Sequence, residues 1–249
     1  MRRSVFRSAN PMLSRIEKDA YVSSHAATYK GVILKSTLLM AVTILAGAFS
    51  MFTLLETGNI NGGIVMLIAS PIIAFISAMV ALSKPSLAPF FSFIYAMFQG
   101  TFIGAISGIY TIEFGDGIVG TALIATAGVF FAMLFLYRSG IIKVTDRFRK
   151  IMFTALLGIF LSSITLFFIS IFSGGLSSGM FGFYALIVVV STIVASLYLI
   201  IDFDRVNQVV SSGADKSYEW TLSLSLLITV VWLYVELLRL IAIIMSSRR

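Results

Sequence analysis

The sequence predicts an all-α, multi-pass membrane protein with seven transmembrane helices, on the basis of three observations. Hydrophobic residues make up 59% of the 249 residues, charged residues only 12%, and the mean hydropathy is +1.01. A soluble domain carries about a quarter charged residues, so this chain has more apolar surface than a water-soluble core can hide. Its apolar runs approach or exceed the ~20 residues that cross a bilayer, and they lack the alternation of a membrane β-barrel.

Charges and turn residues divide the chain into its apolar runs. The predicted spans are 31–54, 63–82, 87–109, 118–137, 151–172, 180–201 and 220–244. Short connections rich in glycine, serine and proline separate them, as expected of loops. The first residues contain no compact apolar segment of the signal-peptide type. We therefore expect a basic cytoplasmic arm over residues 1–30, followed by a seven-helix membrane domain over residues 31–249.

The positive charges predict the orientation. Lysine and arginine lie before the first span and in the even-numbered connections, namely at Arg2, Arg3, Arg7, Arg15, Lys18, Lys30, Lys84, Arg138, Lys143, Arg147, Arg149, Lys150, Arg205 and Lys216. The odd-numbered connections contain only the acids Glu56, Glu113 and Asp116. Since positive residues stay inside, the N-terminus is expected in the cytoplasm. Arg248 and Arg249 would then lie outside, unless the last segment is re-entrant.

The sequence lacks the residues that several classes of activity require. The chain has no cysteine, and its one histidine, His25, precedes the first span. Disulfides, thiolate metal sites and cysteine nucleophiles are therefore excluded, and no serine has an evident base within the membrane. No phosphate-binding loop or metal-binding helix motif is present. We expect neither an enzyme nor a cofactor, and no nucleic-acid partner.

A single polar stripe runs along the last predicted span. Its members are Thr221, Ser225, Thr229, Trp232, Glu236 and Arg239. These residues recur every three or four positions, which places them on one face of a helix. The rest of that helix is almost entirely leucine, isoleucine and valine. Because an intramembrane charge is costly in lipid, this face is expected to point into the bundle.

The sixth predicted span repeats the arrangement. Ser191, Tyr198, Asp202 and Arg205 share one helical face, while Asp204 lies on the opposite side and is expected to be solvated. Gln99, on the third span, is a further polar residue expected to be buried.

Two interpretations of the intramembrane acids Asp202 and Glu236 remain open. They could be neutralised by Arg205 and Arg239, three positions away on the same helices, or they could serve an ion or proton pathway, because neighbouring carboxyls share protons and can bind divalent cations.

Motifs distributed over the whole chain carry a family resemblance. They are Asn10-Pro11 with Leu13-Ser14, KPSLAPFFSFIYAMFQGTFIGAIS at 84–107, YRSGIIKVTDRFR at 137–149, IDFDRV at 201–206, EW at 219–220 and LLITVVWLYVELLRLI at 226–241. With these motifs the sequence resembles the Bax inhibitor-1/YccA family (the transmembrane Bax inhibitor motif proteins), and most closely its bacterial Bax-inhibitor-like branch.

The resemblance implies six helices around a central, hydrophobic seventh. It also implies a pH-sensitive calcium leak, gated by an aspartate pair on the sixth and seventh helices, with cytoprotection and restraint of a membrane protease as other associations of the family. Asp202 matches the sixth-helix aspartate. The seventh-helix position is ambiguous: aligning Leu237-Leu238-Arg239 puts Thr229 there, whereas aligning Leu233-Tyr234-Val235 puts Glu236 there.

Depth in the membrane favours Thr229 as the partner of Asp202. At 1.5 Å per residue, Thr229 lies about 15 Å and Glu236 about 25 Å along the last span from its cytoplasmic end, where Asp202 is expected. We therefore expect Asp202 to be the proton sensor of a cation leak, with calcium the first candidate, and Thr229, Glu236 and Arg239 to line the central helix. Deprotonation of Asp202 is expected to favour opening.

The alternative is a non-conducting regulator that binds a membrane protease or another membrane protein through the basic arm. Both interpretations place the chain in a cell membrane with its N-terminus in the cytoplasm, and the bacterial plasma membrane fits best. Neither identifies a metal site.

Overall fold

The computed structural model describes residues 26–58, 60–173 and 178–247. Within them the helices are α2 (Tyr29–Thr57), α3 (Ile60–Ser83), α4 (Ala88–Phe114), α5 (Gly117–Arg138), α6 (Asp146–Ser173), α7 (Ser178–Ser211) and α8 (Tyr218–Ser246). All seven are long and apolar enough to cross a membrane, which confirms the predicted fold class. Most of the predicted basic arm, with His25, and the two terminal arginines lie outside the described residues.

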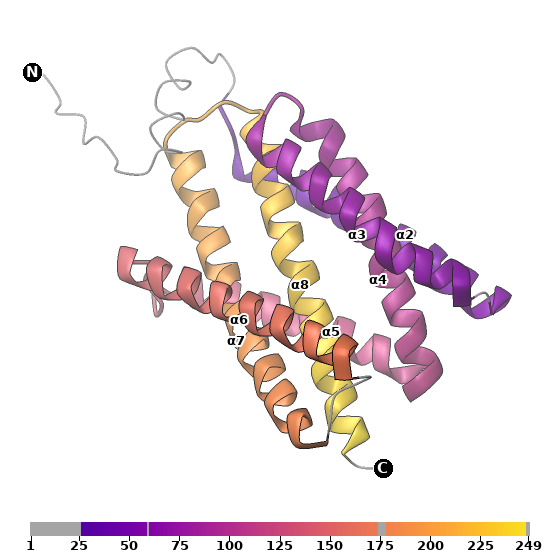
Figure 1. Ribbon diagram of the computed structural model, residues 1–249. Coiled ribbons are helices and arrows are strands. Elements are labelled where there is room, and N and C mark those ends of the chain that lie inside the picture. The colour runs from indigo at the N-terminus through magenta and orange to yellow at the C-terminus, as the bar shows by residue number, and fades with distance from the viewer. Residues whose placement is uncertain (1–25, 59, 174–177, 248–249) are drawn as a thin grey trace, which may run out of the picture.

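Helix α8 forms the centre of the bundle, as Figure 1 shows in yellow. Helices α2, α3, α4, α5 and α7 all pack against it, whereas α6 packs mainly against α7. More than half (56%) of the membrane-spanning part of α8 is buried, compared with 6% for α6. The expected central last helix is therefore present, with α6 joined to the bundle through α7. Because α8 is one continuous helix, a re-entrant last segment is not formed.

Helices α2 and α4 form the most extensive helix pair of the bundle. Ala96, Gly100, Gly104 and Gly108, at four-residue spacing, are all buried on α4. A Cβ atom on Gly104 would overlap the backbone of Gly47 on α2. Small residues at this spacing let two helix backbones approach closely, and the resulting van der Waals packing favours helix association in lipid.

A group of four residues, which we call the Glu219 clasp, joins the beginnings of α2 and α8. The Glu219 side chain is 1% exposed. Its carboxylate accepts hydrogen bonds from the Thr28 amide (2.8 Å) and the Thr28 hydroxyl (3.0 Å), and it forms an ion pair with Lys35. The Lys35 ammonium also lies 5.1 Å from the ring centroid of Trp220. Both charges are thus compensated where the helices meet.

The clasp lies at the end of the bundle that we call the basic end. Here α2, α6 and α8 begin and α5 and α7 end, as shown by the Thr28–Glu219 contact, the Arg149–Asp204 ion pair and the packing of Tyr137 on Phe203. The opposite end, where Phe114 and Ile118 pack near the last turns of α8, carries the acidic connections. The alternation of charge in the sequence therefore corresponds to two distinct ends of the structure.

We predict that Glu219→Gln lowers the stability of the protein by about 3–5 kcal/mol, because it leaves the half-buried Lys35 charge without a counter-charge. Glu219→Gln combined with Lys35→Met should recover a large part of this loss. Thermal unfolding in detergent micelles measures both effects. Glu56→Gln, at an exposed acid, serves as the control. Equal unfolding temperatures for the single and double variants would show that the clasp is not an electrostatic unit.

We also predict that Gly104→Ala destabilises the protein by about 1–3 kcal/mol through overpacking against α2. Gly128→Ala is the matched control, since a Cβ atom at this glycine of α5 meets no neighbouring atom within 4 Å. The control change should be neutral or stabilising by about 0.5–1 kcal/mol, because alanine favours the helix. Equal effects of the two changes on thermal unfolding would contradict close packing at Gly104.

Candidate functional site

The acid Asp202 lies buried between α7 and α8. Its side chain is 4% exposed. Thr229 donates a hydrogen bond to Asp202 Oδ2 (2.5 Å), and Ser225 donates one to Oδ1 (2.8 Å). Each carboxylate oxygen thus accepts one hydroxyl of the neighbouring helix. Ser225 and Thr229 are four residues apart, so successive turns of α8 present both hydroxyls on one face.

Asp202 lies farther from the end of its helix than the sequence suggested. The predicted sixth span ended at residue 201, but α7 continues to Ser211, about 14 Å beyond Asp202 at 1.5 Å per residue. Thr229 lies eleven residues after Tyr218 at the beginning of α8, at a matching depth. The helix extends because residues 203–211 continue to alternate buried and exposed positions with a helical period and pack against α8 and its preceding loop.

A second acidic residue, Glu236, occupies a separate position on α8. It is 5% exposed. The indole nitrogen of Trp232 donates to Glu236 Oε1 (3.2 Å), and Arg239 Nη1 lies 3.6 Å from the same oxygen. Among the described residues, Oε2 of this buried carboxylate has no hydrogen-bond partner. The pairing of Glu236 with Arg239 that the sequence left open is therefore present, although it satisfies only one of the two oxygens.

The two acids do not contact each other through hydrogen bonds. Glu236 lies seven residues beyond Thr229 on α8, about 10 Å along the helix, and the side-chain hydrogen bonds of Asp202 go to Ser225 and Thr229. Tyr198 of α7 lies between the two levels, with its ring 5.8 Å from that of Trp232. Of the two positions considered for the partner of Asp202, the structure brings Thr229 to it.

The remaining predicted site residues lie at the margin of this arrangement. Arg205 is exposed, and none of the ion pairs among the described residues joins it to Asp202. Gln99 is half-buried on α4 and has no hydrogen bond to either Asp202 or Glu236. The pairing of Asp202 with Arg205 that the sequence left open is therefore not formed, and Gln99, which was expected to be buried, is only half-buried.

Asp204 corrects one expectation. It was expected to be solvated, but it is only partly exposed and accepts hydrogen bonds from Arg149 (2.5 Å) and Gln208 (2.6 Å). Arg149 lies in the first turn of α6, so this ion pair ties α6 to α7. The face of α7 opposite Asp202 is covered by α6, which a helical projection of α7 alone could not reveal.

Sequence reasoning also missed the charged pair of the Glu219 clasp. Lys35 is a cation inside the first apolar run and Glu219 directly precedes the last one. A lysine in a membrane span needs a counter-charge, so the position of Lys35 alone could have indicated that a buried acid would be found near it.

The described residues contain no cluster of three or more histidine, cysteine, aspartate or glutamate side chains that could hold a metal ion. Calcium takes six to eight oxygen ligands, which is more than Asp202, Ser225 and Thr229 supply. The arrangement at Asp202 is suited to exchanging a proton or contacting an ion in transit, rather than retaining one.

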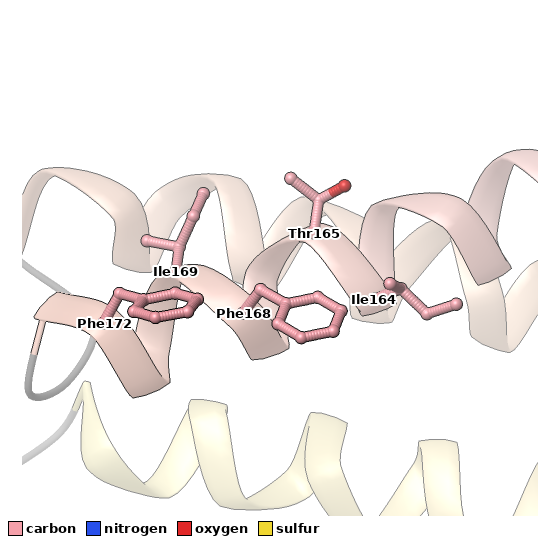
Figure 2. Close-up of a pocket in the computed structure, with 5 residues that line it drawn as sticks. All are labelled: Ile164, Thr165, Phe168, Ile169 and Phe172. Atoms are coloured by element: carbon pink, nitrogen blue, oxygen red, sulfur yellow. The ribbon is translucent and has the colours of Figure 1, made fainter.

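One shallow hollow lies on the outer face of α6, and Figure 2 shows its lining. It is formed by Ile164, Thr165, Phe168, Ile169 and Phe172, all from the same helix. The phenyl groups of Phe168 and Phe172 are largely exposed, as expected of a surface facing lipid. The hollow has no charged residue and lies apart from both acids.

The comparisons with known proteins address the family rather than the site. A comparison with curated proteins gives no match. A family model described as "Bax inhibitor 1 like" matches residues 10–246, which includes every described helix. Since this match covers nearly the entire sequence, the chain belongs to the Bax inhibitor 1-like family of membrane proteins.

Proposed function

We propose that the protein is a pH-sensitive cation leak, with calcium as the first candidate ion and Asp202 as its proton sensor. The observation that carries this proposal is the environment of Asp202: a carboxyl group inside the membrane, 4% exposed, with its two hydrogen bonds made to neutral hydroxyls of the adjacent helix. Membership of the family supports it. The protein acts as a conductor rather than as an enzyme.

Protonation of Asp202 controls how α7 and α8 associate. The neutral acid keeps both partners, because one of the two hydroxyls can turn to accept its O–H while the other still donates to it. The ionised form has no cation in hydrogen-bonding contact, and a buried charge without a counter-ion is costly by several kcal/mol. Separation of the helices lets water or a cation reach the carboxylate and relieves this cost. Deprotonation therefore favours the open state.

Further polar atoms along the same two helices support a path for ions. Ser191 Oγ on α7, Thr221 Oγ1 on α8 and Glu236 Oε2 are buried, and the described residues offer them no hydrogen-bond partner. Buried polar atoms of this kind are the places where ordered water binds in proteins. They extend from near the basic end, past Asp202, to the level of Arg239.

The orientation follows from the positive-inside rule. The basic end, with the beginning of α2 and the Glu219 clasp, faces the cytoplasm, and the membrane is the plasma membrane. Asp202 then senses protons from the cytoplasmic side, while Glu236 and Arg239 form a second polar position toward the outer side.

The change Asp202→Asn removes the titrating proton while preserving the size of the side chain. Calcium entry into dye-loaded proteoliposomes should be faster at pH 8 than at pH 6 for the wild type. The variant should give the slow rate at both values, because asparagine cannot ionise. Asp116→Asn, at an exposed acid in a connection, should behave as the wild type. An unchanged pH profile for Asp202→Asn would contradict the assignment of the sensor.

Two changes at Thr229 test the role of its hydroxyl. Thr229→Val removes one hydrogen-bond partner of the neutral acid and keeps the shape of the side chain, which weakens the closed state by about 1 kcal/mol or more. Calcium flux at pH 6 should therefore rise several-fold. Thr229→Ser retains the hydroxyl and should keep the wild-type profile. The same proteoliposome assay measures both, and equal fluxes for the valine and serine variants would count against closure through this hydroxyl.

The alternative function is a non-conducting regulator that binds another membrane protein. The observation in its favour is α6, which packs mainly against α7 and exposes several phenylalanines, among them Phe160, Phe167 and Phe172. Folded protein that gives only the flux of empty liposomes at both pH values would favour this function. Deletion of residues 1–25 should then abolish binding of the partner. This deletion retains Ala27 and Thr28, which contact Ala214 and Glu219.

A further inference from the structure

A large cavity lies on the side of α8 away from α7. Its volume is about 440 Å³, and its walls come from α2, α4, α5 and α8. Ile44 and Ala48 line it on α2, and Leu123 and Ala127 line it on α5. Its floor includes Tyr234, a buried residue of the central helix. The cavity is thus separate from Asp202, which lies between α7 and α8.

The walls of this cavity are apolar, and their polar groups are already paired. The hydroxyls of Ser107 and Tyr234 are hydrogen-bonded to each other at 2.7 Å. Thr43 donates to the Leu39 carbonyl (2.9 Å) and Thr126 to the Ala122 carbonyl (2.7 Å). A buried water needs two to four polar partners, and a cation needs oxygen ligands. The cavity therefore suits an apolar occupant.

The cavity opens sideways toward the hydrocarbon of the membrane. Helices α2 and α5 each pack on α4 and α8, but they make at most marginal contact with each other. The residues at the gap between them are apolar and largely exposed: Ile44 is 54% exposed, Leu123 48% and Phe131 66%. This opening is continuous with the surface of the bundle that contacts lipid.

The size of the cavity restricts its occupant. A transmembrane helix, about 10 Å wide and 30 Å long, is much larger than this cavity, which therefore fits an acyl chain better than a helix of a partner or of a second copy. A volume of this magnitude is typical of small-molecule sites. An apolar cavity left empty destabilises the fold in proportion to its volume, so lipid at its opening has a reason to enter.

We propose that this cavity is a binding site for one acyl chain of a membrane phospholipid, which enters between α2 and α5 and reaches α8 near Tyr234. The headgroup stays at the membrane surface, and the acyl chain fills the gap between α2 and α5, which barely contact each other. The site is independent of the proposed ion path. It gives the lipid direct access to the central helix.

The test uses phosphatidylcholine with a photoreactive diazirine near the end of one acyl chain. Purified full-length protein is reconstituted with this lipid, illuminated, digested and analysed by mass spectrometry. The expected adducts include floor residues such as Val231 and Tyr234, which are buried and which surrounding lipid reaches only by entering the cavity. Leu199, buried between α7 and α8, is the internal reference. Floor labelling no greater than that of Leu199 in the wild type would overturn the proposal.

Variants that fill the cavity provide the second measurement. Ala48→Phe with Ala127→Phe places two rings in the cavity from α2 and α5, and floor labelling should fall by about ten-fold as the space is occupied. Ala41→Phe with Ala132→Phe is the matched control, at exposed alanines of the same helices outside the cavity, and should leave labelling unchanged. Equal labelling in the filled and control variants would also overturn the proposal.

Discussion

The structure depends on keeping the polar side of α8 away from hydrocarbon. A membrane span that carries a carboxylate, a guanidinium and four further polar side chains on one face is stable only if other helices cover that face. Helix α7 does so, with Asp202 meeting Ser225 and Thr229. The remaining neighbours of α8 cover its apolar faces, so the packing of most of the bundle depends on this helix.

The acids Glu219 and Asp202 have different partners. The helix contact at Glu219 is therefore fixed, whereas the contact at Asp202 can change. Glu219 has a lysine, an amide and a hydroxyl as partners, so its charge is stabilised permanently and α2 is held to α8. Asp202 has two hydroxyls. Its charge is not balanced by a contacting cation, and the proposed function makes the contact between α7 and α8 depend on protonation of this acid. A leak that opens at this contact could leave the packing of α2 on α4 unchanged.

Much of this arrangement could be predicted from the sequence, since each feature depends on one helix at a time. The seven spans follow from apolar length, and the inward face of α8 from the spacing of Ser225, Thr229 and Glu236. The features that sequence reasoning missed depend on two helices at once. The pairing of Asp204 with Arg149 and of Glu219 with Lys35 requires knowing which helices are neighbours. The extension of α7 to Ser211 was missed because its polar residues resemble a loop.

The attachment of α6 to the bundle has a mechanical consequence. Helix α6 packs mainly on α7 and is tied to it by Arg149 and Asp204, so a displacement of α7 away from α8 moves both helices together. The area that the protein occupies in the membrane plane then grows by more than it would if α7 moved alone. Opening must therefore do work against the lateral pressure of the surrounding lipid. Tension in the bilayer would lower this work and shift the equilibrium between the closed and open states toward the open one, as deprotonation of Asp202 does in the proposed function.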